Sequence, residues 1–358
     1  MHNLLKKLSA FTVVALLMTG TAFAQSQSSD ISVTGNDNEA TVDQTGGLHE
    51  AQIKQVGDEN ETTITQDGYS HKGVQTMARG DQNITNITQN GGDFATTSGG
   101  NSLARVELWG DRNLVDITQL GDAQRAFVDI QQGANFDNDV DVRQEGSENA
   151  VNIDINGDAN VVNTVQDGAQ NGIGAVFGTV GVDVDGNNNE SIVQQVGDHN
   201  TTLFAQDGDG NKAVERMTRG DGNAVDIYQM GDDNRAVYEI WGDDNTIDID
   251  QMSSGNDVFI NGRGTPTAPG GGVSDNTVTI HQGGGDFNTV SGFFEDGSES
   301  NMVSIMQSGT GNEVLSASGP GLFIDGDHNT ATIMQSGVGN SAEVEMIGNG
   351  NTSIVNQD

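Results

Sequence analysis

Carboxylates are the most abundant groups in this chain that could do chemistry, with 52 Asp and Glu against 14 Lys and Arg. Many of them follow a glycine, and a Gly-Asp pair between strand patterns predicts a turn. Carboxylates that line the edge of a stack of turns suit a hard cation such as Ca²⁺. One interpretation is therefore weak Ca²⁺ binding, and the other is turn geometry with solubility; no further cofactor is predicted. The candidate residues are Asp58, Asp81, Asp122, Asp198 and Asp232.

A second candidate is the tripeptide Arg-Gly-Asp, which occurs twice and looks like a motif for adhesion to host cells. The copies are Arg79, Gly80 and Asp81, and Arg219, Gly220 and Asp221. Because Gly-Asp is also the ordinary turn of this sequence, the alternative interpretation is that both copies are only turns.

No catalytic constellation is present in the sequence. The six histidines are scattered, cysteine is absent, and no Ser-His-Asp spacing recurs. A polysaccharide lyase built on stacked strands would need long irregular coils with clustered Asp, Lys and Arg, and the short regular units argue against it. The acidic excess also argues against nucleic acid as a partner, since few groups could neutralise phosphates. We therefore expect a protein that is not an enzyme.

An eleven-residue unit recurs through the chain, with Asn at its start, Gln six residues later and Gly two residues after that. Between Asn and Gln, small or β-branched residues alternate with polar ones. Alternation of period two predicts a strand, and the glycine predicts the turn that follows it. Representative pairs are Asn60 and Gln66, Asn113 and Gln119, Asn200 and Gln206, Asn223 and Gln229, Asn301 and Gln307, and Asn329 and Gln335.

One such strand cannot bury its face alone, so two units facing each other predict a coil of about 22 residues. We therefore expect an all-β protein, a β-solenoid of stacked two-strand coils. Stacking at roughly 4.8 Å would place each Gln and Asn over its counterpart, so that the interior amides hydrogen-bond along the stack. This ladder explains how a chain with 33% hydrophobic and 5% aromatic residues can still be ordered.

The solenoid is expected over residues 38–358, with loops near 91–100, 170–188, 263–275 and 318–326, where the units are interrupted. The unit from His71 to Gly80 is one residue too long, which predicts a bulge and places Met77 where other units have Gln. Residues 1–24 have the charged start, the short apolar run and the Ala22-Phe23-Ala24 site of a secretory signal peptide. Residues 25–37 are interpreted as a leading segment for export.

The string Gln55-Val56-Gly57 with Asn60 and Gln66, repeated with Gln195, Asn200 and Gln206, resembles the curlin repeat over nearly all of residues 31–358. The resemblance implies a subunit of curli, a functional amyloid exported through an outer-membrane channel of a Gram-negative-type bacterium. By the same resemblance, it polymerises at the cell surface with copies of itself, other curlin-like subunits or a nucleator, for biofilm matrix and adhesion to surfaces. The alternative is a secreted β-solenoid that acts as a monomeric adhesin or binds ice or cations.

Overall fold

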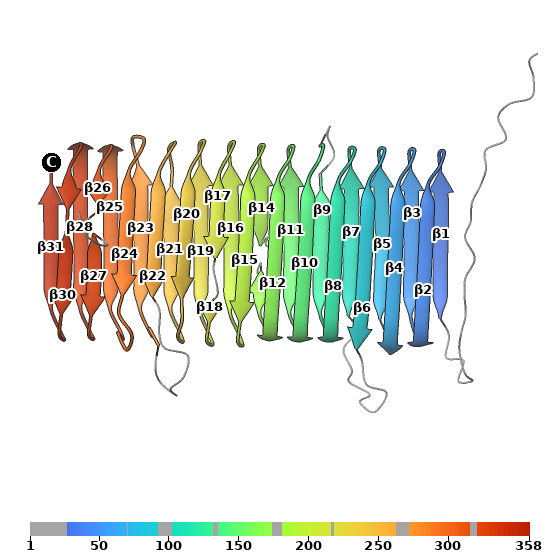
Figure 1. Ribbon diagram of the computed structural model, residues 1–358, viewed down its shortest axis with the longest axis horizontal. Helices are drawn as coiled ribbons and strands as arrows, with labels where there is room; N and C mark the ends of the chain where they lie inside the picture. The colour runs from blue at the N-terminus through green and yellow to red at the C-terminus, as the bar shows by residue number, and fades with distance from the viewer. Residues whose placement is uncertain are drawn as a thin grey trace, which may run out of the picture. The chain divides into compact units, whose positions relative to one another are not determined.

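The computed structural model describes residues 27–69, 71–91, 102–131, 135–173, 181–215, 218–262, 272–315 and 321–358. Every element within these ranges is a β-strand, and the strands form parallel sheets in the manner of a β-solenoid, which confirms the predicted fold class (Figure 1). No helix of the described residues is long and apolar enough to cross a membrane. The predicted signal peptide lies outside the described residues.

Internal contacts divide the chain into two units, residues 1–148 with 156–158, and residues 149–155 with 159–358. Both units are built in the same way. The chain alternates between two sheets, and the strands of each coil pair in parallel with the corresponding strands of the neighbouring coils.

In unit 1, the two sheets contain five strands each. The first sheet is formed by β1 (Ser28–Thr34), β3 (Glu50–Val56), β5 (Lys72–Arg79), β7 (Leu103–Trp109) and β9 (Arg125–Ile130). The second is formed by β2 (Glu39–Gly47), β4 (Glu61–Tyr69), β6 (Ile84–Gly91), β8 (Leu114–Asp122) and β10 (Asp139–Ser147).

In unit 2, some places in the sheets are filled by two short strands. The first sheet contains β11 (Ala150–Asn156), β13 (Gly172–Ile173), β14 (Val182–Asp185), β16 (Thr201–Asp207), β19 (Ala224–Met230), β21 (Thr246–Gln251), β23 (Thr277–Gly283), β25 (Met302–Thr310), β28 (Thr330–Val338) and β31 (Thr352–Gln357). The second contains β12 (Val161–Ala169), β15 (Glu190–Val196), β17 (Lys212–Glu215), β18 (Thr218–Arg219), β20 (Arg235–Ile240), β22 (Asp257–Gly262), β24 (Thr289–Phe294), β26 (Glu313–Val314), β27 (Leu322–Asp325), β29 (Ser341–Ala342) and β30 (Val344–Ile347).

The first coil begins earlier than expected. Strand β1 lies within the segment 25–37, which we interpreted as a leading segment, and it pairs with β3 in full register, Val33 opposite Gln55. Its Ser-Ser-Asp-Ile-Ser-Val sequence has the alternation of a strand, but Gln27 stands at the Asn place of the repeat and Val33 at the Gln place, which is why this repeat was missed.

The interruptions are narrower than the loops expected from the sequence. Strands β13 and β14 lie within 170–188 and both pair with β16, and β27 lies within 318–326 and pairs with β24 and β30. What separates the short strands lies outside the described residues, as do most of the expected loops near 91–100 and 263–275.

The predicted bulge is present in β5, where the register with β3 shifts between Ala51 and Ile53. It has a consequence that the sequence did not show. Ala78, and not Met77, pairs with Leu108 and with Gln55 and takes the Gln place of its unit. The bulge therefore takes up the extra residue of this repeat before the chain reaches the Gln place, which Ala78 occupies.

Turn glycines have a steric reason. Gly57 has φ of +131°, and a Cβ built on it would collide with the carbonyl oxygen of Gly80 in the neighbouring coil. The same relation holds between Gly208 and Gly231 in unit 2. The coils therefore approach so closely at this turn that only glycine fits.

Candidate functional site

A ladder of glutamine amides runs through the interior of unit 1. Nε2 of Gln44 donates to Oε1 of Gln66 (2.8 Å), Gln66 donates to Gln89 (2.9 Å), Gln89 to Gln119 (2.8 Å) and Gln119 to Gln144 (2.8 Å). All of these residues are on the second sheet, and Gln66 and Gln119 are fully buried. Each amide is thus both donor and acceptor, which satisfies polar groups that burial would otherwise leave without partners.

Unit 2 contains a longer ladder, and it is on the first sheet. Each Nε2 donates to the Oε1 of the next coil at 2.7–3.0 Å. The members in order are Gln206, Gln229, Gln251, Gln282, Gln307, Gln335 and Gln357. At the same place on the opposite sheet, β20, β24 and β30 have the apolar side chains Ile240, Phe294 and Met346, so these coils bury an amide against an apolar group.

Asparagines form separate ladders where the chain enters a strand. In unit 1, the backbone N–H and Nδ2 of Asn60 both donate to Oδ1 of Asn38 (2.9 and 3.1 Å), and Nδ2 also donates to the carbonyl oxygen of Gly80 (2.7 Å). The amide therefore links one coil to both of its neighbours. The unit 1 ladder contains Asn38, Asn60, Asn83, Asn113 and Asn138.

Unit 2 has an Asn ladder on each sheet. One contains Asn149, Asn171, Asn200, Asn223, Asn245, Asn276, Asn301, Asn329 and Asn351. The other contains Asn160, Asn189, Asn211, Asn234, Asn256, Asn288, Asn312 and Asn340. All twelve amide residues named from the sequence therefore lie in these hydrogen-bonded columns.

Hydroxyl groups complete the ladders, and the sequence did not single them out. The hydroxyl of Ser191 donates across the interior to Oε1 of Gln206 (2.7 Å), the first member of its ladder. Nε2 of Gln195 donates to Thr202 Oγ1 (2.9 Å), which in turn donates to the buried carboxylate of Glu215 (2.6 Å). The signal that could have found them is the polar residue at a place where other units have Ala or Val.

Two histidines replace Asn in the first sheet of unit 1. His49 and His71 are buried and stacked, with ring centroids 5.3 Å apart and planes 3° from parallel. Nε2 of His49 lies 3.0 Å from the carbonyl oxygen of Thr45, and Nε2 of His71 lies 3.0 Å from that of Asp67. Burial is the main cause that lowers the pKa of both imidazoles.

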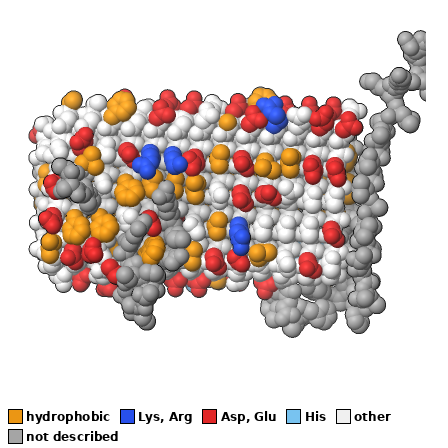
Figure 2. All heavy atoms as spheres, viewed as in Figure 1, with side chains coloured by type: hydrophobic (Ala, Val, Ile, Leu, Met, Phe, Trp, Pro, Cys, Tyr) orange, Lys and Arg blue, Asp and Glu red, His pale blue; other side chains and the backbone are white. Residues whose placement is uncertain are grey.

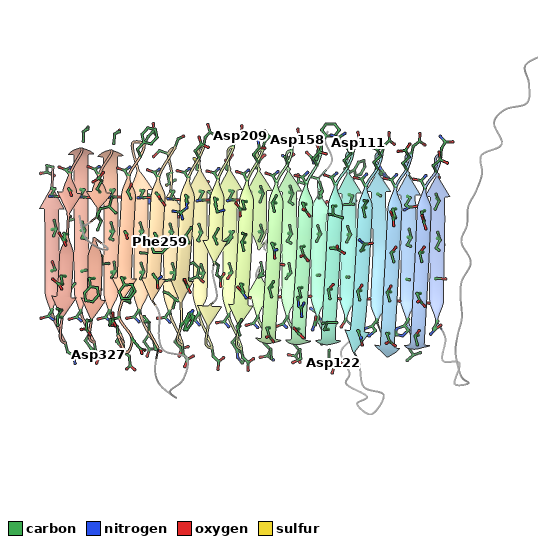
Figure 3. All side chains as sticks on the ribbon, in the orientation of Figure 1. Asp111, Asp122, Asp158, Asp209, Phe259 and Asp327 are labelled. Carbon is green, nitrogen blue, oxygen red and sulfur yellow. The ribbon has the colours of Figure 1, made fainter. Side chains whose placement is uncertain are left out.

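The turn aspartates bind the backbone of the neighbouring coil. Oδ1 of Asp58 accepts from the N–H of Asn36 (2.7 Å), Oδ1 of Asp81 from that of Asp58 (2.8 Å), and Oδ1 of Asp198 from that of Ala169 (2.7 Å). Asp232 accepts in the same way from the N–H of Asp209 (3.0 Å). Figure 3 shows Asp111 and Asp122 at opposite turn edges of unit 1, and Asp209 and Asp327 at opposite turn edges of unit 2.

Nothing in the described parts of the chain gathers three or more His, Asp or Glu side chains around a point where a metal ion could sit. The aspartates Asp58, Asp81, Asp122, Asp198 and Asp232 are spread one to a turn. Their hydrogen bonds to the backbone give most of them a structural role, and weak Ca²⁺ binding stays a prediction.

The first Arg-Gly-Asp tripeptide is held within the fold. The guanidinium of Arg79 lies over the Trp109 ring at 4.2 Å from its centroid, and Asp81 is bonded to the turn before it. In the second copy, Asp221 likewise accepts from the N–H of Asp198 (2.8 Å), and the Arg219 side chain lies outside the described residues. This geometry favours the turn interpretation, and adhesion through either tripeptide stays a prediction.

Acidic side chains also stack on the outer faces of the sheets, where Figure 2 shows many acidic and few basic groups. In unit 2, Asp226 pairs in register with Asp248. The pKa of Asp226 is raised, first by partial burial and then by Asp248 and Asp250. The pKa of Asp248 is raised by partial burial and then by Asp250, while His281 lowers it. Stacking identical coils thus opposes ionisation of the carboxylates.

Both ends of the chain present open strands. Within the described residues, β1 pairs only with β3 and β2 only with β4, while β31 pairs only with β28 and β30 only with β27. Ile31 points inward in register with Ile53, yet it is 37% exposed where Ile53 is 1% exposed, because no coil covers it. No coil of the described residues therefore lies next to the backbone and interior groups at these two ends.

The comparisons with known proteins agree with this arrangement. The family model described as the Curlin associated repeat matches residues 35–68, 220–252 and 326–358. No curated protein matches the chain. Two of the three matched segments lie at the two open ends, and each spans strands and turns of the amide ladders. The resemblance to the curlin repeat is therefore confirmed at three places in the chain, one of which contains Gln55–Gln66.

Proposed function

We propose that this protein is a subunit of a curli-like extracellular fibre, in which copies add to one another through their open end coils. Curlin proteins are structural, non-enzymatic proteins that form fibres at the cell surface. The observation that carries the proposal is the pair of open ends. Among the described residues, strands β1 and β2 at one end, and β30 and β31 at the other, each have an edge with no paired strand.

An open edge of this kind is normally blocked in a protein that stays monomeric, because unpaired N–H and C=O groups invite another chain. Here β31 is a regular six-residue strand whose last Gln carries a free end of the ladder. The coil at the β31 end therefore has the same strand and the same ladder glutamine as the interior coils, which favours the addition of further coils. In this proposal the protein is secreted, the fibre contributes to matrix and adhesion, and catalysis has no part. Other curlin-like subunits, a nucleator and an outer-membrane export channel are its proposed partners.

The experiment is fibre growth by the purified mature protein, followed by thioflavin fluorescence and electron microscopy. The proposal expects fibres whose growth is seeded by preformed fibres. Because stacked carboxylates repel, growth should be faster at pH 5 than at pH 7 and faster with added salt, which screens charge over about 10 Å at 0.1 M. Ca²⁺ that accelerates growth more than equal ionic strength of Na⁺ would support binding at the turn aspartates. A protein that stays monomeric in every condition would contradict the proposal and favour the monomeric adhesin.

A further inference from the structure

Strand β31 belongs to the first sheet, and no described strand of the second sheet comes after it. Strands alternate between the two sheets, so the strand after β31 would lie in the other sheet, over β29 and β30. Resting on the proposed function, we infer that copies join with a half-coil step. The first strand β1 of one copy pairs with β29 and β30 of the preceding copy, and its β2 pairs with β31.

The interior places match in this arrangement. Register within the sheets puts Gln357 at the same place of the unit as Gln335, and Gln44 at the same place as Gln66. With β2 over β31, Gln44 therefore lies over Gln357, and Asn38 lies over Asn351. Both kinds of amide ladder continue from one copy into the next.

The donors and acceptors also match. Each ladder runs with Nε2 of one coil donating to Oε1 of the next. Gln357 accepts from Gln335 and, as the last member, donates only to the carbonyl oxygen of Ser341 (2.9 Å). Gln44 is the first member, and of the described residues none donates to its Oε1. Nε2 of Gln357 in one copy can thus donate a hydrogen bond to Oε1 of Gln44 in the next copy.

The opposite sheet is matched by apolar groups. Met346 takes the Gln place of β30, in register with Ile324, and Val33 takes that place in β1. With β1 over β30, Met346 meets Val33 and Val344 meets Ile31, the residue whose exposure was noted above. The exposed apolar side chains of β1 in one copy are then buried against the apolar side chains of β30 in the preceding copy.

The turns that would meet both have Asn at the place that accepts the N–H of the neighbouring coil. The N–H of Asp327 donates to Oδ1 of Asn349 (2.9 Å) and that of Asn36 donates to Oδ1 of Asp58 (2.7 Å), which is the bond that interior turns make with Asp as acceptor. In the half-coil junction, the N–H of Asn349 faces Oδ1 of Asn36. Both end turns have Asn where interior turns such as those of Asp58 and Asp81 have Asp, so the junction adds no carboxylate to the column.

Pairing β1 with β31 instead fails on each of these points. Gln357 would then lie against Val33, which ends the Gln ladder, and Met346 would lose its apolar partner. The place over β30 would also stay empty, with its backbone groups unpaired inside a fibre.

Disulfide trapping tests the register, since the chain has no cysteine. Ser32, Asp43 and Glu345 occupy the same outward place in β1, β2 and β30, and all are exposed. Paired strands lie about 4.8 Å apart, within reach of a disulfide. We expect fibres of the variant Ser32→Cys with Glu345→Cys to give a ladder of reducible multimers after oxidation. Fibres of the control variant, Asp43→Cys with Glu345→Cys, should give monomers.

The opposite pattern in the two variants, or no cross-link in either, would overturn the half-coil junction while leaving the fibre proposal intact. Wild-type protein that forms no fibres would instead contradict the proposed function.

A glycine variant gives a second test. A Cβ on Gly326 would lie 2.6 Å from the carbonyl oxygen of Gly348, whereas a Cβ on Gly348 meets only Asn351 Nδ2 at 3.9 Å. In the junction, Gly35 of the next copy covers Gly348. We expect Gly348→Ala to fold as judged by circular dichroism and to elongate fibres at least tenfold more slowly. Gly297→Ala has a similar φ, +83° against +90°, and nothing within 4 Å, so it should elongate like wild type. Equal elongation by both variants would overturn the junction.

Discussion

The hydroxyl of Ser191 donates a hydrogen bond of 2.7 Å to Oε1 of Gln206, and this bond crosses the interior from one sheet of unit 2 to the other. Gln206 begins a ladder of seven glutamines, so no amide of an earlier coil donates to it; its partner in the preceding strand β14 is Val184. The serine therefore supplies the donor that the repeat does not.

Ser191→Ala should destabilise unit 2, because it leaves a buried amide oxygen without a donor. The expected loss in the free energy of unfolding is roughly 1–3 kcal/mol. Urea denaturation of the monomer measures it. The exposed Ser304→Ala serves as control and should change stability by less than about 0.5 kcal/mol. Equal effects of the two variants would argue that the crossing bond contributes nothing.

Neighbouring glutamines on opposite faces of β15 test the ladder. Gln195 is buried, accepts from Gln166 (2.9 Å) and donates to Thr202, whereas Gln194 points outward. Gln195→Leu should destabilise the protein by roughly 1–3 kcal/mol for each polar group left without a partner. Gln194→Leu should have little effect. Denaturant midpoints of the two variants give the comparison, and a more stable Gln195→Leu protein would show that an apolar interior serves equally well.

Gly57→Ala should be among the most harmful single changes. The left-handed backbone costs about 1–3 kcal/mol, and the collision with the neighbouring coil adds about 1–3 kcal/mol. Gly297→Ala, with positive φ but open space, should show only the first part. Thermal unfolding of both variants separates backbone strain from crowding between coils, and similar losses would remove the crowding argument.

The stacked aspartates predict that unit 2 becomes more stable on mild acidification. Because the pKa values of Asp226 and Asp248 are raised in the fold, the folded state keeps protons that the unfolded chain has released. The free energy of unfolding should therefore rise as the pH falls from 7 through the raised pKa values, and level off below the ordinary value of 3.8. Asp226→Asn with Asp248→Asn should flatten this profile. A wild-type protein that loses stability over the same range would contradict it, provided that the histidine effect below is removed.

The histidine pair predicts the opposite dependence in unit 1. Burial lowers the pKa of His49 and His71, so the unfolded chain binds protons first when the pH falls below the ordinary value of 6.5. Stability should be lost between 6.5 and the lowered pKa values. The groups that face the pair, Asp67 and Asp122, weaken the effect. His49→Asn with His71→Asn restores the residue of the other units, and unfolding at pH 7.5 and pH 5 should show the loss only in wild type.

The sequence predicted the fold class and the inward amides because the same residue types return at the same place in every regular unit. Gln66 and Gln229 needed no tertiary information beyond that period. The sheet on which each ladder lies could not be predicted, since it depends on how many half coils separate one Gln-containing repeat from the next. Ala78 was missed because a bulge moves the inward place by one residue, and β1 was missed because Gln27 stands at its Asn place and Val33 at its Gln place.

The amide interior also bears on the chain before it folds. A glutamine such as Gln229 gains little by leaving water for a disordered cluster, since it would lose hydrogen bonds there; it gains only when Gln206 and Gln251 are both in place. A hydrophobic core would instead drive early, non-specific collapse of the chain onto any exposed apolar surface. An interior of this kind instead discriminates between partners by geometry, so the unfolded chain has little tendency to associate non-specifically and becomes ordered only against a correctly spaced coil.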